Sequence, residues 1–139
     1  MEKNTHELFH AVNQLSRRLT KHLNEALEPY GLYSAQWSVL YILKEKGTLT
    51  QRELCEYLAV EAPPMTRTIQ RLLKQGYIQQ VSSTEDKRKK FISLSSEAEA
   101  QFPIWEKAVL KKNEDLLNDL PLSTQEALRN IVTDWLKQI

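Results

Sequence analysis

The chain has 139 residues, of which 41% are hydrophobic and 27% charged, proportions typical of one folded domain. A net charge of +1 and a single cysteine, Cys55, exclude a strongly basic or acidic protein, a disulfide framework and a zinc site made of several thiolates. No signal-peptide core and no run near the roughly 20 apolar residues of a membrane span is present, so we expect a cytoplasmic protein without a membrane partner.

Hydrophobic periodicity predicts two helices in the first third of the chain. Apolar residues recur every three to four positions over about residues 5–28, and Pro29 and Gly31 end this helix. A second helix follows, with Ser34 as its expected N-cap and Gly47 after its last turn. It is apolar nearly all round, so we expect it to lie at the buried centre of the domain.

Two shorter helices come next. Thr50 is placed to cap the third helix, and Glu53, three residues on, completes a capping box. This helix is expected to end near Leu58. The fourth spans roughly residues 63–75 and stops at Gly76.

Strand-like sequence then replaces the helical pattern. Residues 77–81 and 90–94 are rich in β-branched and aromatic side chains and predict a hairpin. A long helix is expected to follow to about Asn118, and a capping box of Ser123 and Glu126 predicts the start of a last helix. The fold class expected is mainly α: a winged helix-turn-helix with a two-stranded β-wing, flanked by terminal helices.

Charge is distributed unevenly along the chain. Residues 62–92 hold seven basic and two acidic residues, a net charge of +5, whereas the remainder holds twelve basic and sixteen acidic ones, or −4. Such a basic region is typical of a nucleic-acid-binding face. The hairpin tip STEDKRKKF, taken alone, would indicate no more than a solvated turn.

The fourth predicted helix has two unlike faces. Its apolar stripe comprises Met65, Ile69, Leu72 and Leu73. The opposite face runs through Arg67, Arg71 and Lys74, with Gln70 and Pro63 beside them. Arginine can pair with guanine and glutamine with adenine, and all three cations can reach phosphates. A merely solvated face is the alternative, but the cationic hairpin that follows favours DNA.

Taken together, these residues resemble the MarR family of bacterial transcription regulators. The likeness runs through LYSAQWSVLYIL, LTQRELCEYLAV, MTRTIQRLLKQGYI and STEDKRKKFISLS. Its most specific part is the wing motif Asp86-Lys87-Arg88 with Leu94-Ser95 at the end of the next strand. Thr66-Arg67 and Arg71-Leu72, with Gly76 ending the helix, match the recognition-helix pattern of the family.

The resemblance implies a homodimer that binds a double-stranded, pseudo-palindromic operator. The fourth helix would enter the major groove and Arg88 the adjacent minor groove, oriented by Asp86. A single domain, residues 1–139, would comprise dimerisation helices (1–31 and 96–139) and a DNA-binding region (32–95). The candidate DNA-binding residues are Gln51, Pro63, Pro64, Thr66, Arg67, Thr68, Gln70, Arg71, Lys74, Asp86, Lys87, Arg88, Lys89 and Lys90.

Two departures from the family pattern matter. Members usually carry serine or threonine around the start of the recognition helix, where this chain has Glu61-Ala62-Pro63-Pro64. Prolines offer no N–H donor, so base contact there is expected to be apolar, with thymine methyl groups as candidates. The first helix also lacks the cysteine of the peroxide-sensing branch, and Cys55 fits a buried structural role better than a redox sensor.

Other functional candidates lie outside the basic region. Members often bind a small aromatic or anionic effector, and the candidate residues lining its pocket are His10, Tyr33, Trp37, Tyr41 and Trp105. Tyr33, Trp37 and Tyr41 recur every four residues, however, and ordinary core packing is the stronger explanation of that spacing. The expected dimer interface comprises Leu8, Val12, Leu15, Leu128, Ile131, Trp135, Leu136 and Ile139. His6 and His10 are one helical turn apart, but nothing beside them completes a metal site, so we expect neither metal nor cofactor.

The function expected is that of a dimeric, sequence-specific DNA-binding transcription regulator, acting as a ligand-responsive repressor. The alternative is a winged-helix protein-interaction module with only non-specific DNA contacts. No glycine-rich phosphate loop, acid–base pair or nucleophile constellation occurs, so we expect no enzyme.

Overall fold

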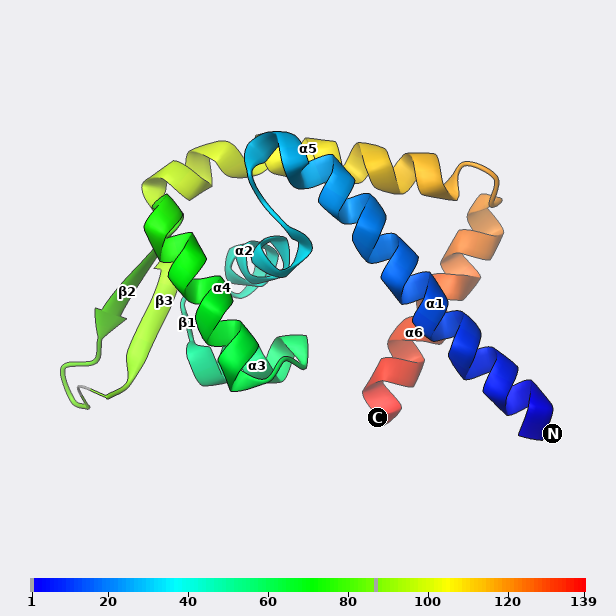
Figure 1. The fold of residues 1–139 in the computed structure, drawn as a ribbon, viewed down its shortest axis with the longest axis horizontal. Helices are drawn as coiled ribbons and strands as arrows, with labels where there is room; N and C mark the ends of the chain where they lie inside the picture. Colours follow the sequence, from blue (N-terminus) through cyan, green and yellow to red (C-terminus); the bar gives the residue numbers. More distant parts are fainter. Residues whose placement is uncertain (1, 87) are drawn as a thin grey trace.

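The structure is a computed structural model that describes residues 2–86 and 88–139. Figure 1 shows a wing-bearing end formed by α2, α3, α4 and the strands, and a second end formed by α1, α6 and the far part of α5. The elements in chain order are α1 (Glu2–Leu27), η1 (Glu28–Tyr30), α2 (Ser34–Lys46), β1 (Leu49–Thr50), α3 (Gln51–Leu58), α4 (Ala62–Gln75), β2 (Ile78–Ser82), β3 (Lys90–Leu94), α5 (Ser96–Leu117) and α6 (Leu122–Gln138).

The sheet is antiparallel, with strand order β1-β3-β2. The predicted hairpin is present, and Ile78 pairs with Leu94 at its base. The two-stranded prediction was incomplete because β1 adds a third strand, in which Leu49 pairs with Ile92. A strand of two residues is too short for the alternation of apolar and polar side chains that reveals strands in sequence.

The core of the wing-bearing end is built around α2, as its apolar sequence predicts. Leu40 of α2 and Leu72 of α4 are both fully buried, and Trp37 stacks on Phe102 of α5 with ring centroids 5.1 Å apart. Trp105 is 1% exposed and meets Tyr77 edge-on. Helix α4 packs on α2 and the sheet packs on α2 and α5, so α4 and the wing stand on one core.

Two predicted helix starts were wrong. The N-cap of α2 is Tyr33, because its N–H donates to the Gln36 side chain (2.8 Å) and the Ser34 N–H donates to Asn24 of α1 (2.7 Å). The capping box at Ser123 does not form. α6 starts two residues earlier than that box predicts, after Pro121, whose carbonyl accepts from the backbone N–H four residues on at 3.0 Å.

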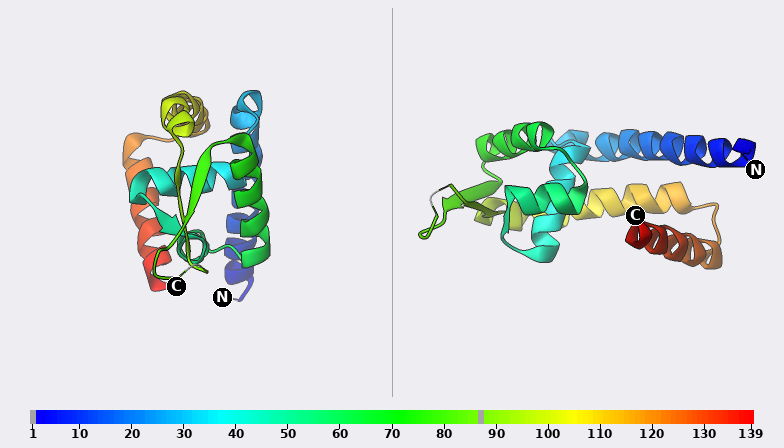
Figure 2. Two further views of the ribbon diagram at one scale, coloured as in Figure 1. Left: turned by 90° about the vertical axis from the view of Figure 1, so that its left-hand side faces the viewer. Right: turned by 90° about the horizontal axis from the view of Figure 1, so that it is seen from below.

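The terminal helices form the second end of the molecule. α1 packs beside α5, α6 folds back beneath, and Phe9 of α1 meets Trp135 of α6 at 5.8 Å between ring centroids (Figure 2). Across residues 2–86 and 88–139, none of the helices is both long enough and apolar enough to cross a membrane. Large apolar side chains are nevertheless exposed along α1, along α6 and at the residue after α6: Leu8, Phe9, Val12, Leu15, Leu19, Leu122, Leu128, Ile131, Val132, Leu136 and Ile139.

Candidate nucleic-acid interface

Helix α4 presents a polar, cationic face to solvent. Met65, Ile69 and Leu72 are buried against the core, which fixes the rotation of the helix about its axis. The residues opposite them are all exposed: Arg67, Gln70, Arg71 and Lys74. The face predicted from the sequence is therefore available to a ligand, and its three cations and one amide suit the edge and backbone of a DNA groove.

The C-terminal end of α4 is tied to the start of α2 by two glutamines. The buried Gln36 donates from Nε2 to Gln75 Oε1 at 2.6 Å, and Gln75 donates from Nε2 to the Gly31 carbonyl at 2.9 Å. Sequence reasoning missed this pair because its members lie 39 residues apart. The link sets the axial position of α4 relative to the α1–α2 connection.

The N-terminal half of α4 is tied to α3 by a pair of DNA-binding candidates. Gln51 Nε2 donates to Thr66 Oγ1 at 2.8 Å, and the Thr66 hydroxyl donates to the Ala62 carbonyl at 2.9 Å. The Thr68 hydroxyl likewise donates to the Pro64 carbonyl at 3.1 Å. Gln51 and Thr66 thus bind each other, and neither threonine has a free hydroxyl proton for a base.

The wing tip is held by a compact set of hydrogen bonds. Ser83 Oγ accepts from the backbone N–H of Glu85 (3.2 Å) and of Asp86 (3.3 Å). The Asp86 carboxylate oxygen Oδ1 then accepts from both the backbone N–H and the Nε of Arg88, at 3.0 and 3.3 Å. The Arg88 side chain is 93% exposed, so the carboxylate fixes the direction of a guanidinium that stands in solvent. Lys87 lies outside the described residues.

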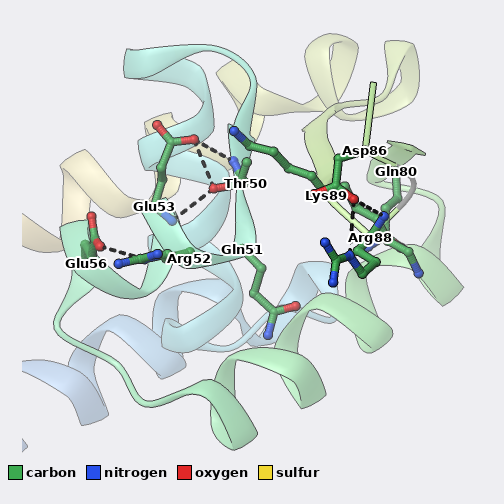
Figure 3. A pocket seen from close by; sticks show the side chains of 10 residues that line it. Thr50, Gln51, Arg52, Glu53, Glu56, Gln80, Asp86, Arg88 and Lys89 are labelled. Atoms are coloured by element: carbon green, nitrogen blue, oxygen red, sulfur yellow. Dashed lines mark hydrogen bonds and ion pairs between the residues drawn. The ribbon is translucent and has the colours of Figure 1, made fainter. Parts of the chain in front are cut away.

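A cleft of about 610 Å³ separates the wing from the N-terminus of α3. Figure 3 shows Lys89 and Arg88 reaching in from the wing side and Glu53 and Arg52 standing on the α3 side. The complete lining is Thr50, Gln51, Arg52, Glu53, Glu56, Gln80, Asp86, Arg88, Lys89 and Lys90. Sequence reasoning missed Arg52, Glu56 and Gln80, since an Arg–Glu pair at i, i+4 reads as an ordinary solvated helix face.

Glu53 has a structural role at this cleft. Its pKa is held below the ordinary 4.5 by hydrogen bonds from the backbone and then the side chain of Thr50, with a further contribution from the positive charge of Lys89. The capping box predicted from the sequence is confirmed, since Glu53 Oε1 accepts from the Thr50 N–H at 3.0 Å and Thr50 Oγ1 accepts from the Glu53 N–H at 3.2 Å.

Comparison with known proteins identifies the family. The MarR family model matches residues 32–90. The HTH-type transcriptional regulator YwoH of Bacillus subtilis is 45% identical over 131 residues, covering 94% of this chain and 95% of its own length. The multiple antibiotic resistance protein MarR of Salmonella typhimurium is 31% identical over 91% of this chain and 79% of its own.

The chain belongs to the MarR family of transcription regulators. Its fold is shared with a mutant MarR from Escherichia coli, whose crystal structure is a complex with operator DNA. That likeness has a TM-score of 0.85 at 23% identity and covers 94% of both chains. The resemblance and the fold class predicted from the sequence are both confirmed.

The five effector candidates do not share one environment. Trp37 and Trp105 are buried in the core, whereas Tyr33 and Tyr41 are 59% and 46% exposed and His10 is exposed on α1. Trp37 lines a cavity of about 510 Å³ among α1, α5 and α6. Tyr33 lines a different one, of about 370 Å³, beside Arg71 and Lys74.

The remaining candidates belong to no assembled site. Cys55 is free and half-buried, so it is less enclosed than expected. Within residues 2–86 and 88–139, no three His, Cys, Asp or Glu side chains gather in a way that could hold a metal ion.

Proposed function

We propose that a homodimer of this chain binds a pseudo-palindromic operator and represses the promoter that contains it. The observation that carries the proposal is the pairing of two positioned cationic elements, the exposed face of α4 and the wing arginine held by Asp86. In this assignment α4 reads base edges in the major groove and Arg88 enters the minor groove next to it. Lys89 and Lys90, with Lys87, add attraction to phosphates that does not depend on sequence.

The proposed dimer accounts for the exposed apolar rows. Ile131 and Leu136 of α6 are 62% and 65% exposed, and Leu15 of α1 is 53% exposed. Soluble monomers rarely expose apolar patches larger than a few hundred Å², and a second copy would cover them. Dimerisation through residues 1–31 and 96–139 also places two recognition helices about 34 Å apart, one turn of B-DNA.

Repression follows physically from occupancy, because a dimer that spans two half-sites excludes other proteins from the same promoter DNA. We place this activity in the cytoplasm, where a bacterial regulator meets its operator. The fold likeness to a MarR protein complexed with operator DNA supports the assignment by analogy.

We further propose that a small aromatic or anionic effector adjusts the spacing of the two DNA-binding regions. The cavity beside Trp37 suits this role because it lies between the terminal helices and is lined by Lys112. The Lys112 ammonium pairs with the exposed Glu25 at 3.3 Å, and a bound anion would compete for it. Benzoate is a suitable probe: saturable quenching of tryptophan fluorescence that weakens operator affinity would support the site, and unchanged affinity at saturation would exclude it.

The function is tested by selecting genomic fragments on the purified full-length protein and footprinting the enriched promoters. We expect enrichment of a sequence with two-fold symmetry and protection over two half-sites. Equal retention of all fragments, with no footprint, would instead favour the protein-interaction module.

A further inference from the structure

We propose that Pro63 is a specificity-determining residue that selects a thymine in each operator half-site through the C5 methyl group. This inference deepens the proposed function and rests on it. Pro63 is exposed and lies on the same face of α4 as Arg67, Gln70 and Lys74, because it precedes Arg67 by four residues. The proline ring therefore forms the N-terminal end of the stripe assigned to the major groove.

The first turn of α4 offers almost no hydrogen-bond donor. Pro63 and Pro64 have no N–H, the Met65 N–H donates to the Glu61 carbonyl at 3.2 Å, and the Thr66 hydroxyl donates to the Ala62 carbonyl. Most helices begin with N–H groups that have no partner within the helix and can bind a phosphate. In the first turn of α4 only the Ala62 N–H remains to donate to a phosphate, so this end of the helix is poorly suited to a polar contact with DNA.

Glu61 makes a phosphate contact at this end still less favourable. It is exposed, it stands at the N-cap, and its side chain makes no capping hydrogen bond. Its negative charge repels the DNA backbone, so the tip of α4 is directed at the groove interior rather than at a phosphate. The surface that meets the bases is then the carbon surface of Ala62, Pro63 and Pro64, all exposed.

The chemistry of the major groove identifies the base. Thymine is the base that presents a methyl group there, whereas the other bases present donors or acceptors along the same edge. A proline ring against adenine, guanine or cytosine would remove water from those polar groups without replacing their hydrogen bonds. A thymine methyl, in contrast, gains from burial, at about 0.8 kcal/mol per apolar carbon.

The spacing along α4 also places the thymine. Pro63 and Arg67 are four residues apart, a rise of about 6 Å along the helix, or roughly two base pairs at 3.4 Å each. The selected thymine should therefore lie within about two base pairs of the position whose base preference depends on Arg67.

The experiment uses the wild-type protein and a duplex selected from a random 30-base-pair pool. Each thymine of that duplex is replaced in turn by deoxyuridine, which removes only the methyl group. We expect one symmetry-related thymine to matter, with affinity falling about fourfold when one half-site is changed and more than tenfold when both are changed. Replacement at the other thymines should leave affinity within twofold.

A variant of Pro63 tests whether this residue causes the preference for thymine over deoxyuridine. Pro63→Ser restores an N–H and adds a hydroxyl, so it should abolish the discrimination between thymine and deoxyuridine while circular dichroism stays unchanged. Pro121→Ser, at the exposed start of α6, is the matched control and should keep the discrimination.

Three results would overturn the inference. They are an operator without a thymine near the Arg67-dependent position, equal affinity for thymine and deoxyuridine at every position, and discrimination that survives in Pro63→Ser. The first two leave the proposed function standing, since a selected operator already shows sequence-specific binding. Failure to select any sequence would remove the proposed function and this inference together.

Discussion

The carboxylate of Asp86 holds both the backbone N–H and the side-chain Nε of Arg88. Among the described residues the exposed Arg88 guanidinium pairs only with Asp86, so we predict that Arg88→Ala weakens operator binding about tenfold or more and leaves the melting temperature unchanged. Asp86→Ala should give a smaller loss, because the arginine remains but is no longer oriented. Fluorescence anisotropy with a labelled operator measures both.

The double variant separates orientation from charge. If Asp86 acts only through Arg88, the variant lacking both side chains should bind no worse than Arg88→Ala alone. Removing the negative charge of Asp86 beside DNA can by itself strengthen binding. A double variant that binds more weakly than Arg88→Ala would therefore contradict the orienting role of Asp86.

A second prediction concerns the hydrogen-bonded pair of the buried Gln36 and the half-buried Gln75. Gln75→Ala leaves the Gln36 amide, 3% exposed, without its partner, and should lower the free energy of unfolding by about 1–3 kcal/mol. Replacing both glutamines by leucine should not recover this loss, because the Tyr33 N–H and the Gly31 carbonyl then lose their side-chain partners. Urea unfolding followed by circular dichroism measures the effect, and Gln79→Ala, on the exposed face of β2, is the control.

A third prediction concerns acid stability. The pKa of Glu53 is lower in the folded chain than its ordinary 4.5, so its stabilising effect is present above pH 4.5 and is lost as the pH falls through the folded-state value. Glu53→Gln should melt below wild type at pH 7, and the difference in melting temperature should shrink as the pH falls below 4.5. For Glu56→Gln, on the same helix, the difference in melting temperature from wild type should not change in this way. A difference for Glu53→Gln that stays constant with pH would contradict the capping role of the Glu53 carboxylate.

A fourth prediction tests the dimer. Ile131→Asp places a charge on the exposed apolar face of α6 and should shift the protein to a monomer in sedimentation experiments at micromolar concentration. Asn130→Asp adds the same charge one residue away and should remain dimeric. A wild-type protein that sediments as a monomer would remove the basis of this prediction.

Local signals in the sequence predicted the local structure well. The Thr50–Glu53 box, the apolar stripe of α4 and the glycine that ends it are each defined within a few residues, and all are present. The contact between Asp86 and Arg88 was expected from the resemblance, and its function on DNA stays a prediction.

Features that depend on distant residues could not be predicted. The Ser34 N–H at the start of α2 donates to Asn24 of α1, and the last residue of α4, Gln75, is bound by Gln36 of α2. β1 exists only because β3 pairs with it. The five effector candidates were chosen as aromatic side chains, and the fold places Tyr33 and Trp37 in different cavities.

A fifth prediction distinguishes base readout from phosphate attraction. Arg67→Ala should relax the preference at one position of each half-site by about 1–3 kcal/mol. Lys89→Ala should weaken binding to every duplex alike and reduce the slope of log affinity against log salt by about one per protomer. The same loss of base preference in both variants would contradict the division of roles.

The most direct test of sequence-specific binding is the ratio of two dissociation constants, measured at one salt concentration near 150 mM with the wild-type dimer. One duplex carries the selected operator and the other a scrambled sequence of equal length and composition. Specific recognition predicts a ratio of about 10³ or more, falling sharply in Arg67→Ala. Equal dissociation constants for the two duplexes would contradict it.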